Sequence, residues 1–442
     1  MAHIAVITSG LFGMLHSSLE VVSRLKSEGH QVTYLSSLDL RSKLEGKDIS
    51  FVQLPSINFR YWPTHNTLLR SWPMRLKHHI KNLKSNNTLG KKNLKFNKFE
   101  EVLSSVNPDK LIIDVELHEV IYSAISLKIP FVLLNQWFPN LRAPSVPPMQ
   151  TDIVPGMGFR GSKAGISLAW TFIKFKAHIR ILILHLVIER YRASVLKRYA
   201  RELGISRNSL KYSSFPPFFH YKEITTLHMT LKDMDFPQID VPKVVYVGPM
   251  VMDNRDKQQQ TIDSEFLDIF ESRQNKGNKI IYCSVSTLNN GDLGFIKKVI
   301  EAVKGQSNWF LIVSLGGKLK KSDFMKVPGN VFIKEWVPQL EVLKNTDCSI
   351  NHAGINTINE CIHFEVPMLV YSGKRHDQNG CAARVVYHRM GLIGNKDLDT
   401  NDDIRTKIST ILKNPEYRNR MKEIGKKYKK VKRSCLSEQL YL

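Results

Sequence analysis

The sequence predicts an α/β protein of two domains, each built on a parallel β-sheet and facing the other across a cleft. In both halves, short apolar runs alternate with apolar residues at helical spacing, and a polar segment without periodicity separates the halves. The length of 442 residues corresponds to about two to three domains. A hydrophobic fraction of 42% and a charged fraction of 24% exclude a mostly disordered chain.

The first half opens on a strand, a helix and a second strand. Residues 4–8 are an apolar run, residues 9–13 contain a glycine turn, and apolar residues then recur at helical spacing over 15–25. The next strand is expected at 32–35. A further strand, helix and strand are expected at 111–114, 120–125 and 130–134. This order is typical of a parallel sheet with right-handed crossovers, so we expect a first domain over 1–245.

The second half repeats the alternation after a polar stretch at 253–264. We expect a linker over 246–275, a second Rossmann-like domain over 276–415, and a C-terminal helix over 416–442 that packs back on the first domain. The strands expected in the second domain are 279–284, 309–313, 331–334, 348–351 and 368–371, with helices at 293–303 and 356–363.

The net charge of +24, from 64 Lys plus Arg and 40 Asp plus Glu, raises the question of an anionic partner. Three basic stretches hold much of the excess, at 70–98, 160–201 and 418–433, and each is explained equally well by a solvated helix face. The sequence shows no basic motif with interspersed aromatic residues and no known nucleic-acid-binding motif, which argues against nucleic acid as the partner.

Cysteine usage and hydropathy favour a reducing, cytoplasmic location. The five cysteines (283, 348, 361, 381 and 435) show no metal-ligand spacing, so buried thiols and no metal site are expected. The N-terminus has no basic segment before a long apolar run, so no signal peptide is expected. The apolar stretch 179–188 is shorter than the roughly 20 residues that span a bilayer.

The chemistry concentrates between Trp336 and Ala383. A buried strand at 348–351 leads through a turn at Gly354 into a helix that Asn356 or Thr357 can cap. A strand, a glycine turn and a helix N-terminus bind anions, because free N–H groups and the helix dipole converge there. His352, at the end of the strand, can add a hydrogen bond to the same anion.

Two residues near this turn fit the rest of a nucleotide. Glu360 follows along the same helix, where a carboxylate can accept from the paired hydroxyls of a ribose. Trp336 precedes Pro338 on a loop and offers a flat face to a base. Each feature alone is common in protein cores, but their joint occurrence at this spacing predicts a nucleoside diphosphate site.

These motifs resemble the donor-binding signature of the UDP-glycosyltransferase superfamily of the GT-B fold. The segments are W-x-P-Q at 336–339, H-x-G-x-N-T-x-x-E at 352–360, V-P at 366–367 and D-Q at 377–378. Gly29-His30 and Gly248-Pro249 also fall where that family has them. The stretches 146–148 and 377–385 look most like bacterial zeaxanthin (carotenoid) glucosyltransferases.

The resemblance implies a role for each matching residue. The implied assignments are Trp336 stacking on uracil, Val337 pairing with the base through its backbone, Gln339 and Glu360 on the ribose, His352, Gly354, Asn356 and Thr357 on the diphosphate, Asp377 and Gln378 on the sugar hydroxyls, and Ser286 and Thr287 in a phosphate-facing loop. The family usually has glycine at the position of Ser286. No cofactor is implied, since the UDP-sugar is a co-substrate.

The resemblance also implies an inverting displacement at the anomeric carbon, assisted by a histidine base and an orienting carboxylate. Asp114 matches the carboxylate, whereas Met14 stands where the family has histidine. His16 lies about 200° further around the helix, so it serves only if the turn is remodelled. His118, Glu116 and Asp114 itself are the alternatives for the base.

Two functions follow. One is a hexosyltransferase that moves a hexose, with glucose compatible, from a UDP-sugar to a small acceptor. The other is a catalytically weak nucleotide-sugar-binding relative that assists another protein.

The stretch 165–188 mixes apolar residues with Lys174, Lys176 and Arg180. It is either a core helix or an interfacial helix on an anionic membrane, and the latter favours a lipophilic acceptor.

Overall fold

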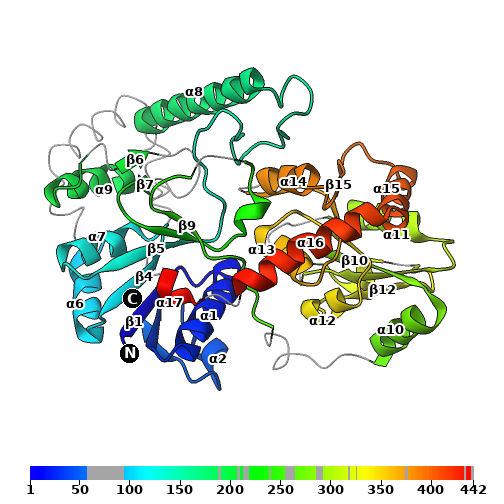
Figure 1. Ribbon diagram of the computed structural model, residues 1–442, viewed down its shortest axis with the longest axis horizontal. Helices are drawn as coiled ribbons and strands as arrows, with labels where there is room; N and C mark the ends of the chain where they lie inside the picture. The colour runs from blue at the N-terminus through cyan, green and yellow to red at the C-terminus, as the bar shows by residue number, and fades with distance from the viewer. Residues whose placement is uncertain are drawn as a thin grey trace.

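The computed structural model describes residues 1–56, 94–187, 191–206, 210–212, 219–237, 240–253, 264–284, 292–316, 319–324, 326–373, 377–432 and 435–439. It forms two α/β lobes side by side, one mainly blue to green and the other mainly yellow to red, with the green helix α10 in the second lobe and the red helix α17 against the first (Figure 1). The predicted pair of parallel-sheet domains is confirmed.

In the described residues, the first lobe contains a seven-stranded parallel sheet of order β3-β2-β1-β4-β5-β8-β9. Residues 4–7 of β1 are completely buried, as expected for a parallel strand covered on both faces. The strands are β1 (His3–Thr8), β2 (Gln31–Ser36), β3 (Ser50–Gln53), β4 (Lys110–Asp114), β5 (Phe131–Asn135), β8 (Thr226–His228) and β9 (Val244–Tyr246).

The described helices of this lobe follow the strands in βαβ order. They are α1 (Phe12–Ser27), α2 (Arg41–Leu44), α6 (Phe96–Val106), α7 (His118–Ser126), α8 (Lys163–Val187) and α9 (Tyr191–Glu202). A two-stranded antiparallel ribbon, β6 (Leu210–Tyr212) and β7 (Phe219–Tyr221), and a 3-10 turn, η1 (Lys232–Met234), complete the lobe. Helix α8 lies along its outer margin (Figure 1).

The described part of the second lobe contains a six-stranded parallel sheet of order β12-β11-β10-β13-β14-β15. Its strands are β10 (Lys279–Ser284), β11 (Trp309–Ser314), β12 (Val331–Lys334), β13 (Cys348–Asn351), β14 (Met368–Val370) and β15 (Gly391–Ile393). Its helices are α10 (Ser264–Lys276), α11 (Leu293–Val303), α12 (Gln339–Lys344), α13 (Ile355–His363), α14 (Gln378–Tyr387) and α15 (Asn401–Lys413), with a 3-10 turn η3 (Lys321–Asp323).

The segment 246–275, expected as a linker, includes most of helix α10, which packs on β10. Phe266, Ile269 and Phe270 of this helix are buried, so its apolar face belongs to the core of the second lobe. The polar composition of the preceding residues concealed that helix.

The C-terminal helices run from the second lobe back to the first. Helix α16 (Pro415–Lys432) packs on α13 and η1, and α17 (Leu436–Gln439) contacts α1 (Figure 1). The Ser437 hydroxyl lies 2.8 Å from His30 Nε2, and the Leu436 amide donates to Glu28 over 2.6 Å. These contacts bind the two lobes together.

Candidate donor site between the lobes

The turn between β13 and α13 is the centre of the candidate site. Ala353 adopts a left-handed conformation with φ of 61°, and its amide donates to Asn351 Oδ1 over 2.9 Å. A Cβ atom at Gly354 would lie 2.6 Å from His352 Nε2, so any other residue here would require the His352 ring to shift. The turn thus presents the amino end of α13 beside the His352 ring, as predicted for an anion site.

Burial and charge keep the His352 imidazole neutral. Desolvation, followed by the positive charge of Lys396, lowers the pKa of His352 to about 4, and Asp292 opposes this shift. Asp292 and Lys396 form an ion pair of 2.9 Å. At neutral pH the ring therefore offers an uncharged N–H group to an anion.

Three buried polar atoms around the turn have no hydrogen-bond partner among the described residues: His352 Nδ1, Ser284 Oγ and Gln378 Oε1. Ser284 ends β10, whose Cys283 pairs with Ile350 of β13, so Ser284 lies at the same sheet edge. Gln378 begins α14. An unpaired buried polar group is costly, and a polar ligand at this edge would satisfy such atoms.

The start of α14 lies against the start of α13. The Ile355 amide donates to Asp377 Oδ2 over 3.3 Å, and the Cys381 thiol lies 3.6 Å from the same oxygen. Asp377 and Gln378 are each 8% exposed. The structure therefore brings the residues implied for the sugar next to the residues implied for the diphosphate.

Gln339 and Glu360 are in direct contact, as expected for a joint ribose site. The Gln339 amide donates to Glu360 Oε2, and the Tyr282 hydroxyl donates to Gln339 Oε1 over 3.0 Å. Glu360 is only 4% exposed. The chain of contacts orients the carboxylate before any ligand is bound.

Trp336 and Val337 lie between β12 and α12. The Trp336 side chain is 49% exposed and free to stack with a planar group, whereas Val337 is 8% exposed and packs in the core of the second lobe. The other loop residues implied for the donor, Ser286 and Thr287, lie outside the described residues.

Asn356 and Thr357 are in the first turn of α13, but Asn356 also bridges to the first lobe. Its amide nitrogen donates to the Gly13 carbonyl over 2.5 Å, and its oxygen accepts from the Ser17 hydroxyl over 3.1 Å. Thr357 is buried. Helix α1 therefore begins directly beside the candidate donor site.

The candidate base region lies at the carboxyl edge of the first sheet. Asp114 is 3% exposed and accepts from the amides of Ser9 (3.2 Å) and Glu116 (3.1 Å). Burial raises its pKa to about 6, although these hydrogen bonds lower it. His16, on α1, is half-buried.

Two other positions in this region belong to the core. Met14 is 3% exposed and packs among the apolar residues beneath α1. His118 is 1% exposed, and its Nδ1 lies 2.9 Å from the Tyr221 hydroxyl. The structure therefore does not support His118 as a base facing the cleft, because α7 turns it toward β7.

Sequence reasoning missed Ser17, Ser284 and the Asp292–Lys396 pair. Ser284 could have been found, because it is the polar residue that ends a predicted buried strand. The other contacts join residues far apart in the chain and leave no local signal.

The comparisons with known proteins agree with this geometry. Residues 306–430 match a family model described as the C-terminal domain of erythromycin biosynthesis protein CIII-like. An uncharacterized UDP-glucosyltransferase, YdhE of Bacillus subtilis, is 26% identical over 273 residues, which cover 60% of this chain and 65% of YdhE. Zeaxanthin glucosyltransferase of Pantoea ananas is 20% identical over 442 aligned residues, covering 96% and 91% of the two chains.

A solved structure, the glycosyltransferase of kitacinnamycin, matches with a TM-score of 0.69 and 17% identity, covering 100% of this chain and 98% of that one. The fold is therefore that of the GT-B glycosyltransferases. The predicted resemblance to UDP-glycosyltransferases is confirmed by the relatives found. The matches to YdhE and two further Bacillus subtilis relatives span 65%, 43% and 44% of those proteins.

Proposed function

We propose that this protein is an inverting glycosyltransferase that moves a hexose, glucose, from a UDP-sugar to the hydroxyl of a small lipophilic acceptor. The observation that carries the proposal is the neutral His352 beside the amino end of α13, with Asp377 and Gln378 on one side and the Gln339–Glu360 pair on the other. Three buried polar atoms there lack partners within the part of the chain that the structure describes, and they fit a polar ligand.

The chemistry proposed is a single displacement. The acceptor oxygen bonds to the anomeric carbon while the bond from that carbon to the diphosphate breaks, and the acceptor proton passes to a base. The N–H groups of α13 and His352 stabilise the departing diphosphate, so the step needs no metal ion. Asp114 either takes the proton or orients His16 to do so.

A catalytically weak nucleotide-sugar-binding protein is the second candidate. The observation that favours it is the burial of Met14 in the core beneath α1, because methionine cannot accept a proton. The intact set of donor residues favours the enzyme, since loss of catalysis removes the need to retain residues that recognise the sugar.

We place the protein in the cytoplasm, in peripheral contact with anionic membrane. All five cysteines are free, and four are buried, which suits a reducing compartment. Among the described helices, none has the length and apolar character needed to cross a bilayer.

The deciding experiment measures UDP-glucose hydrolysis and transfer to a panel of hydroxyl acceptors for wild type, Asp114→Ala and His16→Ala. We expect Asp114→Ala to lower transfer by about 10²–10⁴-fold while UDP binding by calorimetry is retained. Full activity of Asp114→Ala would disprove the proposed base. Tight UDP binding without any transfer would favour the auxiliary role.

A further inference from the structure

An exposed apolar stripe runs along α8. Leu168, Phe172, Phe175 and Ile179 are 62%, 63%, 63% and 41% exposed. Their spacing of four, three and four residues places all of them on one face of the helix. Four large apolar side chains gathered in water mark an interaction surface more often than a solvated face.

The opposite face of α8 already has its packing partners. Ile166 and Trp170 are buried against Ile153, and the Trp170 indole donates to the Val146 carbonyl over 2.7 Å. The stripe is therefore not the side by which α8 joins its own lobe. Packing on the lobe therefore accounts for the face of α8 that carries Ile166 and Trp170, and the exposed face is a separate surface.

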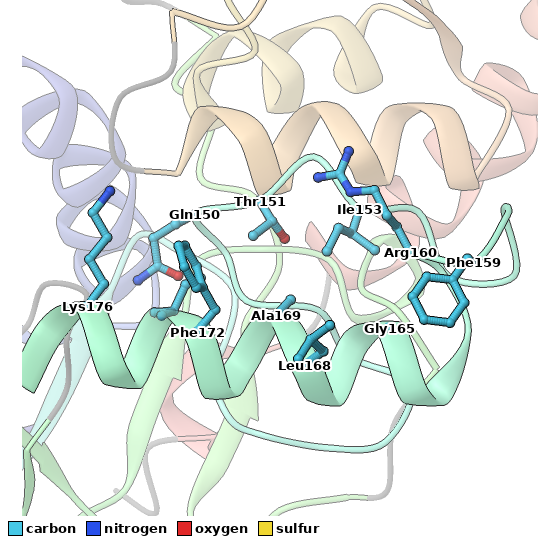
Figure 2. A pocket seen from close by; sticks show the side chains of 11 residues that line it. Gln150, Thr151, Ile153, Phe159, Arg160, Gly165, Leu168, Ala169, Phe172 and Lys176 are labelled. Carbon is cyan, nitrogen blue, oxygen red and sulfur yellow. The ribbon is translucent and has the colours of Figure 1, made fainter.

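A groove of about 700 Å³ opens beside the stripe (Figure 2). The segment 150–153 lines one wall, and Leu168, Phe172 and Lys176 of α8 line the other. Because Leu168 and Phe172 belong to both features, the mouth of the groove meets the stripe. In the preceding turn, Phe159 is 72% exposed and also lines the groove.

The wall of the groove formed by 150–153 is joined to the candidate donor site by hydrogen bonds. The Gln150 carbonyl accepts from Asn379 over 2.9 Å, and the Met149 carbonyl accepts from the Gly380 amide over 3.0 Å. Asn379 directly follows Gln378 on α14. A ligand held in the groove therefore lies on the segment that touches the proposed sugar-binding helix.

The charge around the stripe is positive. Lys163, Lys174 and Lys176 are exposed on α8, and the sequence of α8 contains no Asp or Glu. Aromatic side chains flanked by lysines are complementary to the interface of an anionic bilayer. The same charge disfavours a second copy of this chain, because two such helices repel each other.

We propose that the apolar stripe of α8 docks this protein on an anionic lipid bilayer, with the mouth of the groove facing the lipid. An apolar ligand then enters the groove from the bilayer without crossing water. The identity of that ligand as the glycosyl acceptor rests on the proposed glycosyl transfer. The docking assigns a surface to the proposed membrane contact and does not depend on the transfer reaction.

Vesicle flotation of the full chain tests the docking. We compare vesicles of phosphatidylcholine alone with vesicles containing phosphatidylglycerol, for wild type and Phe172→Ser/Phe175→Ser. The matched control is Leu267→Ser/Leu398→Ser, which changes two side chains 48% and 76% exposed away from α8. We expect the α8 variant to bind at least about tenfold more weakly and the control to bind as wild type does.

A charge test separates the lysines from the stripe. Lys174→Glu/Lys176→Glu should abolish the preference for anionic vesicles, as should high salt, whereas Lys297→Glu/Lys426→Glu should leave it. Equal binding of wild type and both α8 variants overturns the proposal. A wild-type dimer in light scattering that the Phe172→Ser/Phe175→Ser change dissociates also overturns it. UDP binding, measured in parallel, reports on the proposed function separately.

Discussion

Asp114 is a carboxylate that the fold buries at the end of β4, and burial changes its protonation. Its pKa rises from 3.8 to about 6, with desolvation as the largest cause. The folded state therefore retains a proton that the unfolded chain releases near pH 4. Between about pH 4 and pH 6 the contribution of Asp114 to stability decreases as the pH rises. Above pH 6 the folded state carries the full free-energy cost of burying the ionised carboxylate.

This penalty can be measured with Asp114→Asn, which keeps the shape of the side chain and removes the charge. The free energy of unfolding of the variant, minus that of wild type, should increase between pH 4.5 and pH 8 by an amount on the order of 2–3 kcal/mol. Urea unfolding at the two pH values gives this difference directly. A wild-type stability that rises through that window relative to the variant would contradict the assignment.

His352 is the side chain that we expect to contribute most directly to the binding of a diphosphate. His352→Ala should weaken UDP binding by about 1.5–3 kcal/mol, the range for a hydrogen bond to a charged group. The control is His363→Ala at the other end of α13, where the ring contacts Asp253 over 2.9 Å. Calorimetry should show near wild-type affinity for the control, and equal losses in both variants would remove His352 from the donor site.

At the scale of elements, α14 depends on close approach to the segment before α8. A Cβ atom at Gly380 would lie 2.6 Å from both the carbonyl oxygen and the sulfur of Met149. Any side chain there pushes α14 and the segment apart. The residues at the start of α14, Asp377 and Gln378, would move with the helix.

Gly380→Ala should therefore lower stability by about 1–3 kcal/mol through overpacking and raise the KM for UDP-glucose. Gly294→Ala in α11 is the matched control, because a Cβ there meets nothing within 4 Å. That control should be neutral or stabilising by up to about 1 kcal/mol. Thermal unfolding and kinetics of both variants test this, and an unchanged melting temperature for Gly380→Ala would refute it.

At the scale of the whole molecule, local sequence patterns predicted the helices and strands but not the contacts between residues far apart in the chain. The strand predicted at 279–284 matches β10, and the one at 4–8 is one residue shorter than β1. These segments are recognisable because a buried parallel strand must be apolar throughout. The contact of Asn356 with Gly13 crosses 343 positions of sequence, and no period or motif encodes such a pairing.

The same distinction applies to the candidate site. The pairing of Gln339 with Glu360 follows from the resemblance to the donor-binding signature, whereas the position of Glu360 on the predicted helix places that residue alone near a ribose. The burial of His118 against Tyr221 could not be predicted, because it depends on how α7 rotates onto the ribbon of β6 and β7. Residues shared by one βαβ unit are predictable, whereas residues contributed by separate units depend on packing.

One contact between the lobes is a buried ion pair. Arg384 of α14 and Asp235, which follows η1, are each 1% exposed in their side chains, and their closest N–O distance is 2.5 Å. The guanidinium lies 4.3 Å from the ring centres of both Phe138 and Phe236. The Tyr246 hydroxyl donates to the other carboxylate oxygen over 2.7 Å.

Removing the acid leaves a buried guanidinium without its counter-charge, so Asp235→Ala should cost about 3–5 kcal/mol and loosen the lobes. The control is Asp233→Ala, which breaks the half-exposed pair with Lys427 and should cost about 1 kcal/mol or less. Urea unfolding gives the energies, and small-angle scattering should show a larger radius of gyration only for Asp235→Ala. Replacing both partners, as Asp235→Leu/Arg384→Met, should recover much of the lost stability, because no unpaired charge remains. A double variant as unstable as Asp235→Ala would contradict this. It would show that the packing around Arg384, and not its charge, joins the lobes.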